Sequence, residues 1–407
     1  DDTYGSGGDF AKLVNGTLKW PNVKTSPTDD YSWVPVDLSH AAINSRGRFY
    51  PTGAGRKNNL KDAFRNVVLE INRDNAPSAT GSAGGASTNI RTGLNIYGAG
   101  YVPERWSGYV KSNKLDTAGN VTSNTDWGIG AGGVDNTTAS LLDARNFNTR
   151  VVLTTNDDAP NKGVSFEWDI GNTKLSAAQK TLLNADSKGQ DRVNFLRGER
   201  SKENGTSFRV RDSVQGDIVN SGIWYVDAPA SNYAFAGYKA FSSAHRDRLP
   251  MIYVGGNDGM LHGFSAVNGQ EQIAYVPKGL IADLPQLSAP SYTHRYFVDG
   301  SPFTGDLKVG AGNAAADWRT YLVGTLAAGG KGYFVLDVTQ PGNKSGAGSS
   351  TFTASNAASL VVLDRTLNAS ATVASGADED IGHIFAPPVL DESNPFKATQ
   401  IAKLNDD

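Results

Sequence analysis

The chain has 407 residues and a net charge of −3, from 38 Lys and Arg against 41 Asp and Glu, and it contains no cysteine. Nucleic acid is not an expected partner because no basic patch stands out, and the missing thiols exclude disulfides, thiolate zinc sites and cysteine nucleophiles. The sequence contains no apolar run of about eighteen residues, so it predicts no transmembrane helix. The 46 glycines, many flanked by Asn, Asp or Ser, favour short strands joined by tight turns.

The N-terminal part predicts loops followed by one helix. Residues 1–50 contain several proline breakers, and the apolar residues from Leu60 to Ile71 recur at helical spacing after Asn59, a suitable N-cap. Residues 80–88 are small and flexible in composition, which is typical of a linker. We therefore expect a separate segment over 1–79, a linker over 80–88 and a second domain over 89–407.

The second domain opens with short strand candidates and then a helical insertion at about 176–197. The strand candidates are Leu94–Tyr97, Trp106–Lys111, Ala139–Leu142 and Arg150–Thr155. Ser176 and Gln179 form a capping box for a helix over Ser176–Asp186. A second helix over Asp191–Leu196 is expected to end at Gly198.

A strand–turn–strand unit then recurs along the chain. The first copy consists of Met251–Gly255, a turn at 256–259, Met260–Ser265 and Glu271–Val276, and the second of Thr320–Thr325, a turn at 326–331 and Gly332–Asp337. Tyr253 and Tyr321 occupy matching places. A weaker third copy is expected at Ile384–Leu390 and Ala398–Leu404.

Such a repeat is typical of propeller blades. The predicted fold class is mainly β: a quinoprotein-like β-propeller with irregular blades and long loops, incomplete in this chain, preceded by a short α-containing segment. A β-sandwich with two similar hairpins is the alternative. The polar start at Asp1 and the unpaired strand candidate near the end lead us to expect an internal fragment.

The sequence offers no convincing catalytic or metal site. None of the five histidines forms a metal-binding pair: His262 and His40 are expected to be packed, and His245 to be solvated. Three acidic stretches lack the alternating oxygen ligands of a calcium loop and are expected to be turns or solvated loops: Asp1-Asp2 with Asp9, Asn257-Asp258-Gly259 and Asp378-Glu379-Asp380. No Gly-x-Ser-x-Gly elbow occurs, and Arg197-Gly198-Glu199 is interpreted as a helix end. We expect no catalytic, cofactor-binding or metal-binding residues, and no enzyme.

Several stretches in order resemble the PilC/PilY family of type IV pilus proteins. They are RVNFLRGER (192–200), FRVRDSVQGDIVNS (208–221), MIYVGGNDGMLHGF (251–264), EQIAYVP (271–277), YTHRYFVDGSP (292–302), WRTYLVGTLAAGGKGYFVLDVT (318–339) and GHIFAPPV (382–389). Upstream, DLSHAAINSRGRFY (37–50) and the helix after it resemble the segment that closes the family's von Willebrand A-like domain. This likeness makes 1–79 the remnant of that domain.

The resemblance implies an exported protein at the cell surface, at the pilus tip or associated with the outer membrane. It implies that the protein supports pilus assembly with minor pilins and the tip complex, counters retraction, and adheres to host-cell or abiotic surfaces. Some members carry a calcium loop of the form D-x-D-x-D-G, which is absent from this sequence. No cofactor is evident here, and calcium enters only through the resemblance.

Two other functions stay open at this stage. A quinone-dependent propeller dehydrogenase would need a repeated blade motif ending in Trp, whereas Gln270-Glu271-Gln272-Ile273 follows Gly269. A purely structural surface module without a ligand is the third possibility.

Overall fold

The structure is a computed structural model that describes residues 12–13, 15–17, 19, 79–84, 95–103, 105–115, 121–125, 127, 136–156, 158, 162–231, 233–346, 348–371, 380–386, 389–390 and 402–403. The chain divides into two units, Asp1–Ala76 and Pro77–Asp407. The predicted helix after Asn59 and the stretch 37–50, which carries the likeness to a von Willebrand A-like domain, lie outside the described residues. The account below therefore concerns the second unit.

The first sheet of this unit is antiparallel, in the order β1-β2-β3-β4. Its strands are β1 (Ala79–Gly84), β2 (Asn95–Val102), β3 (Ser107–Leu115) and β4 (Val121–Thr125). The predicted strands near 94–97 and 106–111 are confirmed. Within the predicted linker over 80–88, residues up to Gly84 belong to β1, which pairs with β2. Strand pairing uses backbone groups, which small residues offer as well as large ones.

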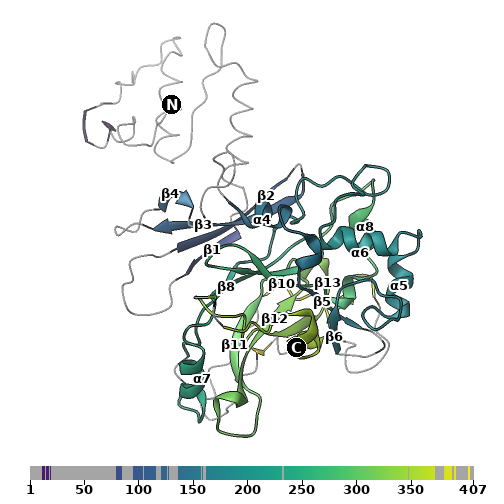
Figure 1. Cartoon of the computed structure of the whole chain (residues 1–407). Coiled ribbons are helices and arrows are strands. Elements are labelled where there is room, and N and C mark those ends of the chain that lie inside the picture. The colour runs from purple at the N-terminus through teal and green to yellow at the C-terminus, as the bar shows by residue number, and fades with distance from the viewer. Residues whose placement is uncertain are drawn as a thin grey trace. The chain divides into compact units, whose positions relative to one another are not determined.

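The second sheet has the order β6-β5-β10-β9-β8-β7 (Figure 1). Its strands are β5 (Val152–Asn156), β6 (Lys162–Ser165), β7 (Trp224–Val226), β8 (Met251–Gly255), β9 (Leu261–Ser265) and β10 (Glu271–Tyr275). The antiparallel run β7-β8-β9-β10 is a four-stranded meander that confirms the first predicted repeat. Gly259, at φ 91°, occupies the turn between β8 and β9, where a left-handed residue was expected.

The third sheet, β11-β12-β14-β15, is a second four-stranded antiparallel unit. Its strands are β11 (Phe303–Lys308), β12 (Trp318–Thr325), β14 (Tyr333–Asp337) and β15 (Val361–Asp364). The predicted strands of the second repeat are confirmed, but Tyr253 and Tyr321 are not equivalent in burial. Tyr253 is fully buried, whereas Tyr321 is half-exposed. The next residue, Leu322, is as fully buried as Tyr253.

Two short strand pairs complete the described sheets. They are β13 (Gly330–Lys331) with β16 (Leu367–Asn368), and β17 (Val389–Leu390) with β18 (Ala402–Lys403). The second pair lies within the predicted third repeat, although Ile384 and Phe385 are not in a strand.

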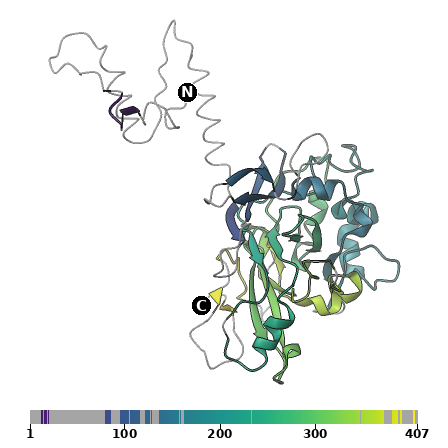
Figure 2. The same ribbon diagram turned by 60° about the vertical axis from the view of Figure 1, so that its left-hand side comes forward.

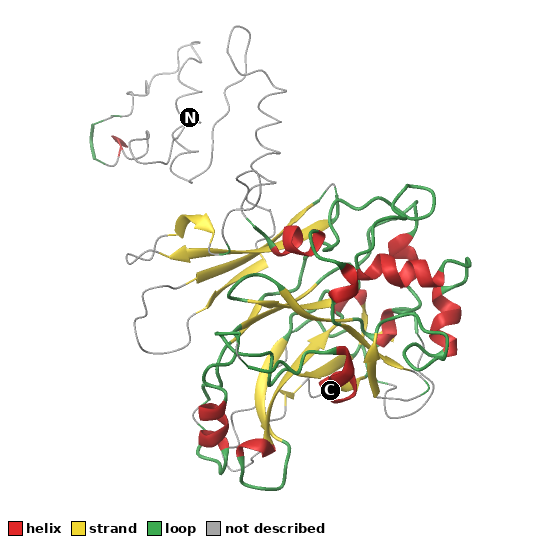
Figure 3. Cartoon of the chain, viewed as in Figure 1, coloured by secondary structure: helices red, strands yellow, loops and turns green. Residues whose placement is uncertain are grey.

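Short helices connect the strands, and α5, α6 and α8 gather on one side of the sheets (Figure 3). The helices are α4 (Thr138–Asp143), α5 (Ala177–Leu183), α6 (Gly189–Arg197), α7 (Tyr238–Ala244), α8 (Leu284–Ser288) and α9 (Ala357–Leu360), with 3-10 turns η2 (Phe147–Thr149), η3 (Lys278–Leu280), η4 (Ala315–Asp317), η5 (Ala327–Gly329) and η6 (Ala354–Asn356).

The helix signals in the sequence have mixed outcomes. The capping box of Ser176 and Gln179 is present at α5, and Gly198 ends α6 at φ 114°, as predicted. The strand predicted at Ala139–Leu142 is wrong, because these residues belong to α4. Thr137 and Ser140 cap each other there and satisfy the first backbone amides of a helix.

Figure 2 shows the sheets of this unit from a second direction. Two clusters of buried apolar side chains lie between the faces of the sheets. One cluster joins the second sheet to the third, through buried side chains that include Met251, Tyr253, Leu261, Leu322 and Phe334. The other joins the opposite face of the second sheet to the first, through Ile252, Val254, Phe264, Tyr97 and Val110. Four-stranded antiparallel sheets stacked in this way are the blades of a β-propeller. Within the described residues, no helix is both long enough and apolar enough to span a bilayer.

Candidate functional site

A buried ion pair lies where β5 and β10 run side by side. The parallel pairing of Ala274 with Val152 brings the start of β10 beside Arg150, two residues before β5. Arg150 therefore meets Glu271 through two bonds, Nε to Oε2 at 2.7 Å and Nη2 to Oε1 at 2.8 Å. Both side chains are 1% exposed. Removing both charges from water costs several kcal/mol for each ion, which only such a paired geometry offsets.

His262 extends this pair into a chain of four charges. Its Nδ1 lies 2.9 Å from Glu271 Oε1, and its Nε2 lies 3.0 Å from Asp258 Oδ2. Burial by itself would lower the pKa of His262, but the charge of Asp258 and the hydrogen bonds to Asp258 and Glu271 raise it to about 9. We therefore describe it as an imidazolium between two carboxylates.

The two acids of this charge chain are held ionised. Burial would raise the pKa of Glu271, but Arg150 and His262 outweigh it and lower that pKa well below its usual range. The pKa of Asp258 is lowered as well: His262 and the amide of Gly216 outweigh the burial that opposes ionisation. The two cations and two anions of the charge chain thus cancel in charge, which favours a structural role over proton transfer.

Residues 215–222, called the strap here, bond to the first and second sheets and to the segment before the third. The Gln215 carbonyl accepts a bond from Gly108 of β3, at 3.2 Å. The Gly216 amide donates to Asp258, at 2.8 Å. Ser221 Oγ accepts from Gly255 of β8, at 2.8 Å, and donates to the carbonyl of Gly300, just before β11, at 3.0 Å.

Two further residues of the strap bind buried polar groups. Asp217 accepts bonds from the Asn257 side chain and from His294 Nε2, both at 2.8 Å. Asn220 donates to both carboxylate oxygens of Asp299. Burial, followed by the charge of Asp217, raises the pKa of Asp299, and the bonds from Asn220 oppose that rise. The strap is thus hydrogen-bonded to strands of the first and second sheets and to the segment that leads into β11, which holds these parts together.

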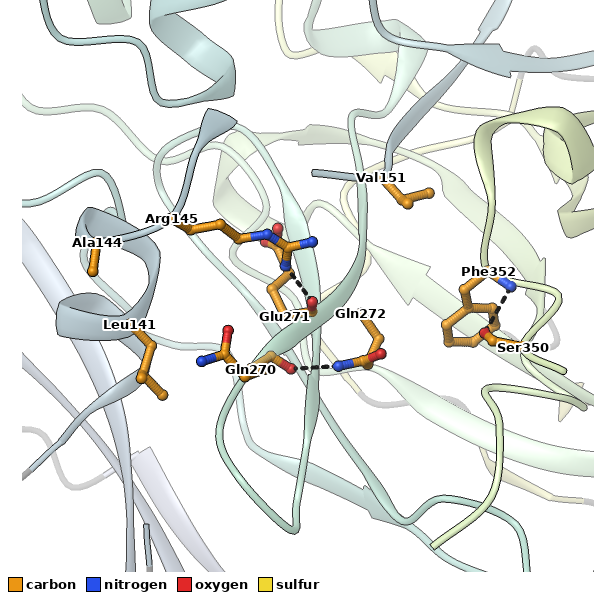
Figure 4. A pocket seen from close by; sticks show the side chains of 9 residues that line it. All are labelled: Leu141, Ala144, Arg145, Val151, Gln270, Glu271, Gln272, Ser350 and Phe352. Carbon is orange, nitrogen blue, oxygen red and sulfur yellow. Dashed lines mark hydrogen bonds between the residues drawn. The ribbon is translucent and has the colours of Figure 1, made fainter. Parts of the chain in front are cut away.

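An open pocket of about 530 Å³ lies above Glu271 (Figure 4). Its lining consists of Leu141, Ala144, Arg145, Val151, Gln270, Glu271, Gln272, Ser350 and Phe352. Most of its polar groups already have partners within the protein. Arg145 donates to the carbonyls of Glu271 and Thr149, and Gln272 donates to the carbonyl of Gln270. The pocket therefore offers few groups for holding a ligand.

The histidines singled out from the sequence do not converge on one site. His262 is packed, as predicted. His245 is half-buried against Phe241 and not fully solvated, because its Nδ1 bonds the Phe241 carbonyl in the last turn of α7. His294 stacks on Trp106 with ring centroids 3.8 Å apart, and His383 bonds the carbonyl of Ala327. His40 lies outside the described residues.

The acidic candidates are separate as well. Asp258 belongs to the charge chain, Asp380 is exposed, and Asp1, Asp2, Asp9, Asp378 and Glu379 lie outside the described residues. Among the residues that the structure describes, no group of three or more His, Asp or Glu side chains could hold a metal ion. The Arg197-Gly198-Glu199 tripeptide is a helix end, as interpreted.

Sequence reasoning missed the charge chain and the strap. Arg150 and Glu271 are 121 residues apart, and neither lies in a motif that signals pairing. The sequence analysis included most of the strap only within residues 208–221, a stretch that resembles the PilC/PilY family. Asp217 and Asn220, two polar residues in an otherwise loop-like segment, were the signal available.

The chain is similar to known proteins over most of its length. Residues 215–353 match the family described as the PilY1 beta-propeller domain. The type IV pilus biogenesis factor PilY1 of Pseudomonas aeruginosa strain PAK is 34% identical over 370 residues, covering 84% of this chain and 29% of that protein. A PilY1 homologue of Xylella fastidiosa is 41% identical over 180 residues, covering 42% of this chain and 14% of that protein.

The chain thus spans less than a third of the length of the Pseudomonas relative. Among solved structures, the Pseudomonas aeruginosa PilY1 C-terminal domain is 30% identical, with 41% of this chain and 28% of that one covered. The TM-score is 0.25, so the arrangement of the sheets is described from this chain alone.

Proposed function

Since the chain belongs to the PilY1 family, whose relatives are named type IV pilus biogenesis factors, we propose that it is part of a pilus tip protein. In this role it supports pilus assembly, counters pilus retraction and mediates adhesion to host-cell or abiotic surfaces. The observation that carries the proposal is the 34% identity to such a factor over 370 residues.

The packing of the blades supports this role physically. A tip protein is pulled whenever the pilus retracts against an attached surface, so its domains must resist separation. Here the buried charge chain holds strands of the second sheet together, and the strap joins the first and second sheets to the segment before β11. Such bonds, shielded from water, are stronger than on the surface. A propeller of this kind presents loops for contact while its blades stay fixed.

The partners follow from the same proposal. Minor pilins and other components of the tip complex would bind the protein during assembly, and a surface ligand would bind it during adhesion. The location would be the cell surface, at the pilus tip or in association with the outer membrane.

The test is deletion of the gene, followed by counts of surface pili with and without active retraction. We expect few pili in the deletion strain, recovery when retraction is also blocked, and full recovery when the whole protein is supplied. An unchanged number of pili in the deletion strain would contradict the proposal.

We propose further that this stretch is not an enzyme and works without a bound cofactor. In the blade turn, Gln270 to Ile273 stand where a quinone enzyme's blade motif would end in Trp. Quinone and flavin cofactors absorb light at about 300–500 nm. The absorbance of the purified protein in this range therefore tests whether a cofactor is bound. A thermal shift with added calcium tests for a metal: an unchanged midpoint is expected, and a rise with calcium concentration would contradict the proposal.

A further inference from the structure

A second pocket, of about 590 Å³, lies on the outer face of the third sheet. This volume falls within the range of about 300–1,000 Å³ that is typical of ligand sites. Its walls come from the end of α7, from β12 and β14, and from the segments after them, and they include His245, Arg319, Tyr321, Asp337, Gln340 and Leu360.

Strand alternation places the polar wall of this pocket toward solvent. Along β12, Trp318, Thr320 and Leu322 are buried, while Arg319, Tyr321 and Val323 are half-exposed. Tyr321 pairs directly with Asp337 on the neighbouring strand. The aromatic ring, the guanidinium and the carboxylate therefore share one face of the sheet.

The charges of this wall cancel. Arg319 Nε lies 3.3 Å from Asp337 Oδ2, and Arg319 Nη1 donates to the carbonyls of Ala316 and Trp318, each at 2.7 Å. The Thr339 amide donates to Asp337 Oδ1, at 2.9 Å. Both ions are thus fixed in place, and neither an anion nor a cation is favoured as the ligand.

Three side chains of the pocket have hydrogen-bonding atoms that no described residue binds closely. His245 Nδ1 is 3.0 Å from the Phe241 carbonyl, so in the neutral ring Nδ1 carries the proton and Nε2 is an acceptor. The hydroxyl of Tyr321 has no hydrogen-bond partner among the described residues, and burial followed by the charge of Asp337 raises its pKa, so it stays a donor. Within the described part of the chain, the side-chain amide of Gln340 makes one long contact, at 3.5 Å to the Ser349 carbonyl.

We propose that this pocket binds one neutral sugar unit of a surface glycan. An aromatic ring beside paired donors and acceptors, without net charge, suits a ligand that carries many hydroxyls and an apolar ring face. The inference rests on the proposed adhesive function and names its ligand class. The pocket above Glu271 is a weaker candidate, because its polar groups are mostly bonded within the protein.

The test is binding of the purified full chain to an array of neutral, sialylated and sulfated oligosaccharides. We expect binding to neutral glycans. Tyr321→Phe removes one donor and should weaken that binding about threefold to tenfold, the effect of one hydrogen bond. Tyr333→Phe is the matched control, because Tyr333 is also half-exposed on this sheet but lies outside the pocket; its affinity should equal that of the unchanged protein.

A second variant tests the charge argument. Asp337→Asn keeps an oxygen for the Thr339 amide but leaves Arg319 without its counter-charge, so sialylated glycans should gain in binding relative to neutral ones. The thermal midpoint of each variant confirms that it is folded. Each of three results would overturn the proposal: no glycan bound, a preference of the unchanged protein for anionic glycans, or binding that Tyr321→Phe does not alter.

This test is separable from the test of the pilus role. If the protein restores pili in a deletion strain but binds no glycan, the sugar pocket is wrong and the assembly role stands. If glycans bind but pili do not depend on the gene, the sugar pocket stands and the assembly role is wrong.

Discussion

The four-stranded meander of the second sheet has the same antiparallel design as the third sheet, but the two differ in how much of each is exposed. In the second sheet, every residue of β8 and β9 is buried, because sheets cover both of its faces. In the third, buried and half-exposed residues alternate along β12 and β14. One repeated sequence pattern thus produces an inner blade, in the second sheet, and an outer blade, the third sheet. The sheets packed against each blade determine how much of it is buried.

The same contrast extends to the charges. The ion pair of the second sheet, Arg150 with Glu271, is 1% exposed on both sides. That of the third, Arg319 with Asp337, is 37% and 19% exposed. We infer that the inner blade sets the stability of the stack, whereas the outer blade supplies a surface for contact.

The largest expected effect is from Glu271→Gln. This change leaves Arg150 and His262 buried without their shared counter-charge, and removal of one partner from a buried pair costs about 3–5 kcal/mol. Urea unfolding of the purified protein measures it. A loss below about 1 kcal/mol, the usual value of a surface pair, would remove the distinction between the two blades.

The second prediction concerns the pH dependence that His262 gives to the inner blade. Its folded pKa, about 9, is raised above the ordinary 6.5. The stabilisation is therefore fully present below about pH 6.5 and is lost as the pH rises through 9, by on the order of 3 kcal/mol.

The measurement is the urea midpoint of the unchanged protein and of His262→Gln between pH 6 and pH 10. The difference between the two should shrink as the pH rises. Parallel curves would show that His262 is not an imidazolium in the folded state.

A smaller effect is expected from Ser221→Ala in the strap. The hydroxyl accepts a bond from β8 and donates one toward β11, so its loss leaves two buried backbone groups unpaired, at a cost of about 1–3 kcal/mol. Hydrogen exchange should show faster opening at Gly255, where the two sheets meet. Protection that stays at the level of the unchanged protein would mean that the strap does not hold them together.

The smallest effect is expected from Asp337→Asn in the outer blade. Its partner Arg319 is more than a third exposed, so solvent screens the pair and the stability should fall by at most about 1 kcal/mol. Thermal unfolding, compared with Glu271→Gln under the same conditions, provides the check. Equal losses in the two variants would contradict the assignment of inner and outer blades.

Much of the blade architecture was predictable from local signals. The strands around Met251 and Thr320 alternate with glycine turns, and the capping box at Ser176 is encoded within four residues. The strand predicted at Ala139–Leu142 was wrong because the cap formed by Thr137 and Ser140 outweighed a short apolar run.

The site itself was not predictable in the same way. Arg150, Asp258, His262 and Glu271 meet only because β5 pairs with β10, and no local pattern announces that pairing. The different burial of Tyr253 and Tyr321 also depends on which sheets lie beside them. Long-range packing decided both features, and a single sequence carries little trace of it.

The most direct test of the account is immunogold labelling of intact cells and sheared pili, with antibodies against residues 251–339. Gold at the ends of pili is the predicted result, since a tip protein would occupy one position on each filament. Gold confined to the cell interior would contradict the central claim that this chain works at the pilus.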